Sequence, residues 1–404
     1  MFGCIILTSQ AWGQVAKSPF SQYAFGDTYT NALANTQGTG TGVSQPQFWF
    51  INNQNPALLI YNSYSTFQAG ALGERKTISN SSGSEKFKGG NMNYLVMAFP
   101  VKQRKWTTSL GLMPYSSMNY KVQSIDGIEG SNGTVLTTRE GKGGISQLYW
   151  SNGVRIYKDF SLGLKATYLF GAVDRSSKFN QIPIVVVQDK SHVKDFTFSL
   201  GASYSKDSLW GDNYRLSVGA VYEMGADVRT FLYNKISSLG PSDDTLRARE
   251  TRTSGYTHLP PSITAGASIG KGMKWSIGTE FKYQDWSSFK TMELTAGSLD
   301  KSWSASLGGE FTPDPDAIEG FLKRLTYRVG VSQAQYPYLA NAAKVKDLGI
   351  NFGFSIPTGR SSIDLAFKVG SRGNKDDNSL KESYFRVYLG FTFNDVWFIK
   401  RKFD

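Results

Sequence analysis

Residues Ser361–Val369 (SSIDLAFKV) and Phe385–Phe393 (FRVYLGFTF) decide the fold that this sequence predicts. In both stretches, apolar side chains alternate with polar or small ones. Successive side chains of a β-strand point to opposite faces, so a period of two predicts strands with two different faces. The same alternation recurs at Phe160–Phe170 and Trp275–Tyr283. The sequence therefore predicts an all-β protein.

The lengths of these segments favour a membrane barrel over a soluble β-sandwich, whose strands would also alternate. Many segments keep the pattern for about nine residues, close to the 9–11 that a tilted strand needs to cross a bilayer. Sandwich strands average about five or six residues. The apolar runs, such as Leu95–Phe99, are far shorter than the roughly 20 residues of a membrane helix. If the chain spans a membrane, it does so by strands.

The connections between the predicted strands alternate between short and long. Even-numbered strands end in tight turns, such as Lys158-Asp159, whereas odd-numbered strands end in long polar loops, such as Ser124–Gly143, Ser176–Val193 and Asn234–Arg252. Short periplasmic turns and longer external loops are typical of bacterial outer-membrane barrels, and an even strand number places both termini in the periplasm. We expect about fourteen antiparallel strands, beginning near Tyr64, Gly90, Trp106, Gly144, Phe160, Lys194, Tyr214, Gly255, Met273, Ser302, Arg324, Asp347, Ser361 and Glu382.

The chain divides into three parts. Residues 1–13 resemble the end of an export signal, because Ala11-Trp12-Gly13 fits a small-x-small cleavage site before Gln14. Residues 14–60 are rich in Asn, Gln, Gly and Thr and hold few strand signals, so we expect a plug inside the barrel lumen. Residues 61–404 form the predicted transmembrane barrel. Cleavage removes Cys4, the one cysteine, and with it disulfide and thiolate chemistry.

The formal charge of +12 raises the question of partners. The basic residues occur singly or in small clusters and match no nucleic-acid-binding motif, so nucleic acid is not expected. Attraction to anionic lipid or lipopolysaccharide headgroups is a better reason for excess positive charge on a membrane protein. We therefore expect the chain in the outer membrane of a Gram-negative bacterium.

No constellation of residues indicates catalysis. Gly266–Gly270 (GASIG) matches the G-x-S-x-G nucleophile motif, but that motif needs a strand–turn–helix and here lies in alternating strand sequence. The two histidines, His192 and His258, are far apart, and no acidic cluster has calcium-loop spacing. We expect no enzyme activity, no cofactor and no metal site.

Charged side chains fall on the inferred inner face of the barrel. We expect them to pair with one another and with the plug. The alternative is a polar pathway, or a Lys or Arg that binds the carboxylate of an acidic ligand headgroup. These inner charges are Lys165, Glu223, Glu280, Lys282, Glu310, Arg328, Asp364, Lys368 and Arg386.

Two short stretches carry a resemblance to a known family. A Gly-rich run, then Asn55-Pro56-Ala57, then the first strand resembles the FadL/TodX family of outer-membrane transporters for fatty acids and aromatic hydrocarbons. Leu259–Ile263 followed by Asp285–Phe289 is similar to a second stretch of that family. The resemblance implies a fourteen-stranded barrel with an N-terminal hatch, whose ligands leave sideways through a gap in the third strand.

The third strand here contains Gly111 and Pro114. Proline has no N–H to give to the ladder, so we expect Pro114 to kink or bulge the wall and to mark a lateral opening. The alternative is a strand end near the membrane surface without a gap.

The resemblance implies passive uptake of hydrophobic or amphipathic small molecules, such as long-chain fatty acids. Because some relatives are subunits of larger machines, the alternative is a non-transporting structural or shuttle subunit of an outer-membrane protein secretion or assembly complex. Expected partners are therefore membrane lipid, a hydrophobic ligand and, in the alternative, other outer-membrane proteins.

Overall fold

The computed structural model describes residues 15–127, 133–209, 213–240, 245–292, 299–317 and 319–397. The expected signal remnant at residues 1–13 lies outside the described residues. Among the described residues, no helix is both long and apolar enough to span a bilayer.

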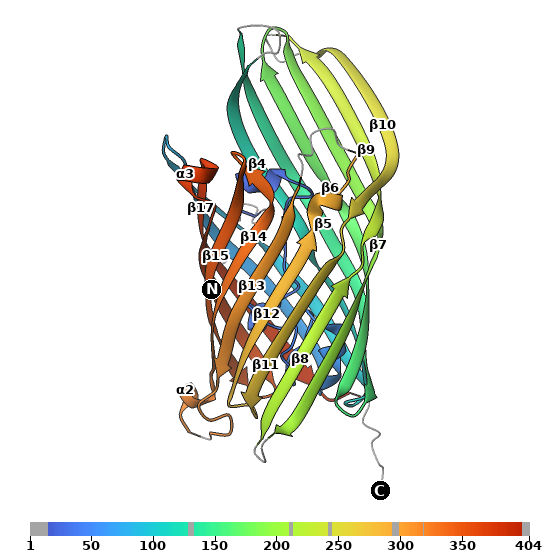
Figure 1. Ribbon diagram of the computed structural model, residues 1–404, viewed down its shortest axis with the longest axis vertical. Coiled ribbons are helices and arrows are strands. Elements are labelled where there is room, and N and C mark those ends of the chain that lie inside the picture. The colour runs from blue at the N-terminus through green and yellow to red at the C-terminus, as the bar shows by residue number, and fades with distance from the viewer. Residues whose placement is uncertain are drawn as a thin grey trace, which may run out of the picture.

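Antiparallel strands form a closed barrel (Figure 1). The last strand pairs with the first wall strand from Lys381↔Ser79 to Asp395↔Ser65, which closes the ladder. The wall strands are β2 (Ser65–Ser79), β3 (Ser84–Lys102), β4 (Trp106–Gly127), β5 (Thr134–Tyr157), β6 (Phe160–Asn180), β7 (Ile184–Leu209), β8 (Tyr214–Glu223), β9 (Ala226–Leu239), β10 (Thr245–Leu259), β11 (Ser262–Lys271), β12 (Trp275–Asp285), β13 (Lys301–Phe311), β14 (Thr326–Ala340), β15 (Ala343–Thr358), β16 (Ser361–Arg372) and β17 (Lys381–Asp395).

Two positions in the wall are each occupied by a split strand. β8 and β9 share one position, and both pair with β7. β11 and β10 share the next position, where β11 pairs with β8 and β10 pairs with β9. Pro260-Pro261 separates β10 from β11, since proline cannot donate to a ladder. The sixteen described strands from β2 to β17 thus form a wall of fourteen, as the sequence predicts.

The remaining elements are short. The first strand and three helical turns lie before the barrel, in a segment described below with the site. These elements are η1 (Pro19–Gln22), β1 (Asp27–Thr28), α1 (Ala34–Gln37) and η2 (Pro56–Tyr61), and the connections between wall strands contain η3 (Trp286–Ser288), α2 (Phe321–Arg324) and α3 (Lys375–Asn378).

Several of the expected long loops are strand instead. β5 begins at Thr134, β7 at Ile184 and β10 at Thr245, each ten residues before the predicted start. The paired strands β4–β7, β9 and β10 rise as a tall sheet at one end of the barrel (Figure 1). Beyond the lipid both faces of a strand meet water, so the apolar alternation stops while the backbone ladder continues. The sequence pattern therefore marks where the lipid ends and not where the strand ends.

The outward face of β7 shows the lipid-contacting band. Phe196, Phe198, Leu200 and Tyr204 are exposed large hydrophobic side chains, whereas the intervening Ser203 is buried. The band from Phe196 to Tyr204 covers about nine residues, the length that a tilted strand needs to cross the bilayer. Aromatic side chains at both of its limits are typical of the interfacial girdles of such barrels.

A charge placed in the middle of this band tests its exposure to lipid. We expect Leu200→Arg to lower the free energy of unfolding in lipid vesicles by about 2–4 kcal/mol, because the guanidinium must enter hydrocarbon. Ala248→Arg, on the exposed part of β10, should change it by less than about 0.5 kcal/mol. Urea titration of both variants measures the difference, and equal effects would contradict the assignment.

Candidate functional site

The N-terminal segment, residues 15–62, lies inside the ring of strands. Its η2 contacts β4, β5, β6 and β7, and its α1 contacts β15, β16 and β17 on another part of the wall. Ile51 and Leu58 are fully buried, and more than half of the residues of the segment are buried. The segment (blue in Figure 1) therefore runs across the lumen between separate parts of the wall.

The Asn55-Pro56-Ala57 motif fixes the end of this segment against the wall. The Asn55 side chain accepts a hydrogen bond from the Ala57 amide (3.0 Å) and caps η2, in which Pro56 is the first residue. The Asn55 amide group donates to the carbonyls of Val43 (2.8 Å) and Ala202 (3.1 Å). Asn55 is completely buried, so its role here is to join the segment to itself and to β7.

Glycines of the wall make the seat for this motif. Gly153, Gly163 and Gly201 are register partners on β5, β6 and β7. A Cβ atom on any of them would lie within 2.4 Å of an atom of Asn55 or Pro56. Any larger residue at these three positions would push the motif off the wall. The alternation pattern does not reveal this row, because it does not distinguish a glycine that contacts the N-terminal segment from any other small residue on the inner face.

The ladder between β3 and β4 stops partway up the wall. The rungs run from Lys102↔Trp106 to Leu95↔Leu112. Above that point β4 continues to Gly127 paired with β5, while β3 continues paired with β2. Among the described residues, no rung joins β3 to β4 beyond Leu112.

The N-terminal segment takes the place of β3 beside the upper part of β4. Strand β1 pairs Asp27 with Ser117 and Thr28 with Ser116. The Tyr29 amide donates to the Tyr115 carbonyl at 2.9 Å, and the Ser18 amide donates to the Asn119 carbonyl at 2.8 Å. The segment thus supplies hydrogen-bond partners to an edge that would otherwise be open.

Gly26 allows this close approach. Its φ is +97°, and a Cβ atom there would lie 2.2 Å from the Ser117 carbonyl oxygen. A side chain at this position would therefore both strain the backbone and separate β1 from β4.

The two expected third-strand residues differ in their surroundings. The register of β4 against β5 shifts between Pro114 and Ser116, which places a bulge at Tyr115. At Gly111 the ladder is regular on both sides, and a Cβ atom would lie 2.5 Å from the Tyr149 ring. The irregularity of the strand therefore lies at Pro114, and Gly111 makes room for an aromatic ring.

Four of the expected inner charges form two ion pairs, one between neighbouring strands and one between β12 and β8, which lie on either side of β11. Arg328 Nε and Glu310 Oε2 are 3.1 Å apart on directly opposite residues of β14 and β13. Lys282 Nζ and Glu223 Oε2 are 2.8 Å apart.

Two more inner charges contact the N-terminal segment. Lys165 Nζ donates to the Asn53 side-chain oxygen at 3.3 Å and lies 4.1 Å from the centre of the Tyr149 ring. Glu280 Oε2 accepts hydrogen bonds from the amides of Gly42 (3.0 Å) and Val43 (3.1 Å). These contacts join β6 and β12 through the segment.

The other three inner charges have different surroundings. Asp364 accepts hydrogen bonds from the hydroxyls of Ser355, Ser362 and Thr392. Arg386 Nε lies 3.3 Å from Glu74 Oε2. The Lys368 side chain has no hydrogen bond or ion pair with any described residue, and it faces a cavity.

The cavity has a volume of about 380 Å³ and lies between the N-terminal segment and the wall. One part of its lining is charged, with Lys165, Lys368 and Glu223. Another part is apolar and aromatic. The apolar and aromatic lining includes Leu169, Val221, Leu259, Trp286, Tyr336 and Tyr338. Such a lining suits a molecule with a polar end and a hydrophobic body.

A buried ionic cluster, which the sequence pattern does not reveal, lies near the end of the lumen away from the short turns. Arg372 Nη1 donates to Asp27 Oδ1 at 2.7 Å. Lys76 Nζ lies within 3.7 Å of carboxylate oxygens of Asp27, Glu74 and Glu382. Lys76 lies in β2 at a point where the apolar alternation has already faded. The signal that could have found the cluster is Glu74 and Lys76 two residues apart, on one face of β2.

The G-x-S-x-G match has a structural role here. Ser268 lies within β11 and donates to the Ser44 carbonyl of the N-terminal segment at 2.8 Å. His258 lies near the end of the preceding strand, β10, and contacts Asp227, with 2.6 Å between His258 Nδ1 and Asp227 Oδ1. Among the described residues, no group of three or more His, Cys, Asp and Glu side chains could hold a metal ion.

The barrel is similar in fold to solved structures of hydrophobic-compound channels. A FadL homologue from Pseudomonas aeruginosa has a TM-score of 0.63 and 14% identity, covering 91% of this chain and 99% of that chain. The CymD monoaromatic hydrocarbon channel has a TM-score of 0.59 and 13% identity, covering 93% and 99%. The P. putida toluene transporter TodX has a TM-score of 0.59 and 14% identity, covering 91% and 99%. The fold resemblance expected from the two short stretches is thereby confirmed.

Sequence comparisons give one family. No curated protein sequence matches the chain. A family model described as BamG matches residues 1–404. Because this match covers the whole sequence, the chain belongs to the BamG family.

Proposed function

We propose that the chain is an outer-membrane channel for the passive uptake of hydrophobic or amphipathic small molecules. The observation that carries this proposal is the interrupted ladder between β3 and β4 beside an internal cavity. Leu112, where the rungs stop, is the seventh residue of β4, so the interruption begins within the 9–11 residues that cross the bilayer. Tyr115, just above it, lines the cavity.

In this proposal the N-terminal segment is a movable plug. Residues 27–29 both line the cavity and pair with β4. Displacing them would open a path from the cavity, between β3 and β4, into the hydrocarbon of the membrane. Transfer of an apolar molecule from water into hydrocarbon is favourable, so diffusion alone would draw the ligand onward.

The proposed orientation places the short turns in the periplasm. The C-terminal strand β17 ends on that side. The first described residues lie elsewhere, since the Ala16 amide donates to Glu74 at 2.8 Å and the Val15 carbonyl accepts from Asn119 at 2.6 Å. That both termini of the mature chain lie in the periplasm stays a prediction.

The cavity supports an acidic headgroup as part of the substrate class. The Lys368 side chain makes no hydrogen bond or ion pair among the described residues and interacts with Asp347 only at longer range, so a carboxylate would complete its hydrogen bonding. Long-chain fatty acids combine such a headgroup with an apolar tail. The solved channels of similar fold are named for toluene and monoaromatic hydrocarbons, which lack this group.

A second candidate is a non-transporting subunit of a larger outer-membrane complex. The buried cluster around Arg372 and Lys76 favours it, because both cations hold Asp27 of the N-terminal segment. Gentle solubilisation and purification distinguish the two functions. Co-purified fatty acid or hydrocarbon supports uptake, whereas stoichiometric protein partners together with a sealed lumen support the subunit.

Locking the plug to the wall tests uptake directly. Thr28 and Ser116 are register partners, and paired residues lie about 4.5–5.5 Å apart, within disulfide range. We expect vesicles containing Thr28→Cys/Ser116→Cys to take up a long-chain fatty acid at least tenfold faster after reduction than when oxidised. Thr77→Cys/Ser383→Cys locks a regular wall pair and should show no redox effect. Equal uptake by the oxidised and reduced plug variant would refute plug movement.

The charge of Lys368 tests the ligand class. We expect Lys368→Gln to weaken binding of a long-chain fatty acid about tenfold, since a hydrogen bond to a charged group contributes about 1.5–3 kcal/mol. Binding of an uncharged hydrocarbon should not change. Lys86→Gln, an exposed lysine of β3, is the matched control. An unchanged fatty-acid affinity by titration calorimetry would exclude Lys368 as the headgroup site.

A further inference from the structure

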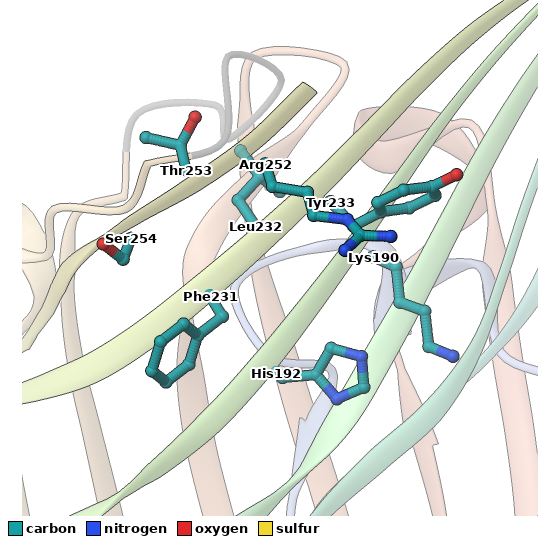
Figure 2. Close-up of a pocket in the computed structure, with 8 residues that line it drawn as sticks. All are labelled: Lys190, His192, Phe231, Leu232, Tyr233, Arg252, Thr253 and Ser254. Atoms are coloured by element: carbon teal, nitrogen blue, oxygen red, sulfur yellow. The ribbon is translucent and has the colours of Figure 1, made fainter. Parts of the chain in front are cut away.

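A cluster of cationic side chains lies on the outer surface of the tall sheet. We call it the basic patch; it consists of Lys190 and Lys194 on β7, Arg229 on β9 and Arg252 on β10, with His192 between the lysines. Figure 2 shows Lys190, His192 and Arg252 together with the aromatic rings of Phe231 and Tyr233.

The parity of the strands places the patch on the outside. On β7, Ser191 and Val193 are buried and face the interior, so the residues that alternate with them face outward. On β9, Thr230 is buried in the same way. The register joins Lys190, Tyr233 and Arg252 in one row across three strands.

The height of the patch is set by the lipid-contacting band. Phe196 is the last exposed hydrophobic residue of that band on β7, and Lys194 and His192 are the next outward residues. A strand rises about 3.3 Å per residue, so with a barrel tilt of about 40° Lys194 lies roughly 5 Å and Lys190 roughly 15 Å above Phe196. This interval is the headgroup layer of the outer leaflet.

The cations of the patch are not neutralised by the protein. Among the described residues, neither Lys190 nor His192 has a hydrogen bond or ion pair from its side chain. Lys194 Nζ and the Arg252 guanidinium lie over aromatic rings, 4.8 Å from the centre of Phe231 and 5.7 Å from that of Tyr233. These contacts orient the two cations and leave their hydrogen-bonding capacity free.

Three acidic groups lie near the four lysine and arginine cations of the patch, and one of them, Glu250, interacts with Arg252 as well as with Lys235. Asp174, opposite Lys190 in register, accepts a hydrogen bond from the Gln188 side chain at 3.0 Å. Asp195 accepts from the Arg229 backbone amide at 3.1 Å. Glu250 lies 3.5 Å from Lys235, above the patch. The patch therefore keeps a surplus of positive charge.

We propose that the basic patch binds the phosphorylated headgroup of an outer-leaflet glycolipid, that is, lipopolysaccharide. Arginine and lysine form charge-assisted hydrogen bonds with phosphate oxygens, and basic clusters at the membrane surface attract anionic lipids. Phe231 and Tyr233 add apolar surface that suits the boundary between acyl chains and sugars. The occupant is a lipid and not a free anion, because the patch faces the bilayer side of the wall directly above the lipid band.

The test compares two triple variants of the full chain in detergent. Lys190→Gln/Lys194→Gln/Arg252→Gln removes three of the four lysine and arginine charges of the patch. Arg104→Gln/Lys158→Gln/Lys206→Gln removes the same charges from exposed positions at the short-turn end. Binding of purified lipopolysaccharide is measured by native mass spectrometry, with circular dichroism to check that each barrel is folded. We expect the patch variant to bind at least tenfold more weakly, the control variant to bind within twofold of the wild type, and Lys194→Gln to be intermediate.

Three outcomes would overturn the proposal. The first is a folded patch variant that binds lipopolysaccharide as tightly as the wild type. The second is equal binding of dephosphorylated lipopolysaccharide, which would remove phosphate from the interaction. The third is complete displacement of the glycolipid by millimolar inorganic phosphate, which would make the site one for a free anion.

Discussion

Every backbone N–H and C=O group that lies in the lipid needs a hydrogen-bond partner, and the structure depends on this constraint. Hydrocarbon offers no hydrogen-bond partner, so a spanning strand needs a neighbour on each side or the wall must close. The wall meets this condition through fourteen positions and the closing pair of β17 with β2. Its interruption lies between β3 and β4, where residues 18–29 supply the partners that β3 does not. The N-terminal segment is therefore part of the hydrogen-bonded wall as well as the contents of the lumen.

The interior then determines how firmly that segment is held. At one end Asn55 and Pro56 rest on wall glycines, in contacts that leave no space for a side chain. At the other end Arg372 and Lys76 bind Asp27. Removing one member of a buried ionic cluster leaves its partners uncompensated, and costs about 3–5 kcal/mol. In the proposed mechanism residues 27–29 move, while Asn55 and Pro56 stay against the wall glycines. The two ends of the N-terminal segment therefore have different roles.

The sequence predicts the strands best where they enter the membrane at the short-turn end. The observed starts of β4, β6, β8 and β16 coincide with the predicted residues, because apolar alternation begins there together with the ladder. At the long-loop end the alternation stops about ten residues before the pairing does, so the predicted β5, β7 and β10 are too short.

The same boundary explains which site residues could be predicted. Glu310 and Arg328 lie within the alternating region, and their inward parity indicated lumen charges. Arg372 and Glu382 lie beyond it, so their burial depends on contacts with the N-terminal segment that no local pattern contains. The glycine seat needs the same long-range information, because a row across β5, β6 and β7 exists only once the register is known.

The central claim is that the N-terminal segment replaces β3 as the partner of the upper part of β4. Hydrogen–deuterium exchange on the full chain in lipid nanodiscs, comparing the wild type with Gly26→Val, tests it most directly. We expect the amides between Tyr115 and Asn119 to exchange faster in the variant than in the wild type, and those of Trp106–Leu112 to exchange at the same rate. If Tyr115–Asn119 were as well protected in Gly26→Val as in the wild type, the segment would not be the partner of this part of β4.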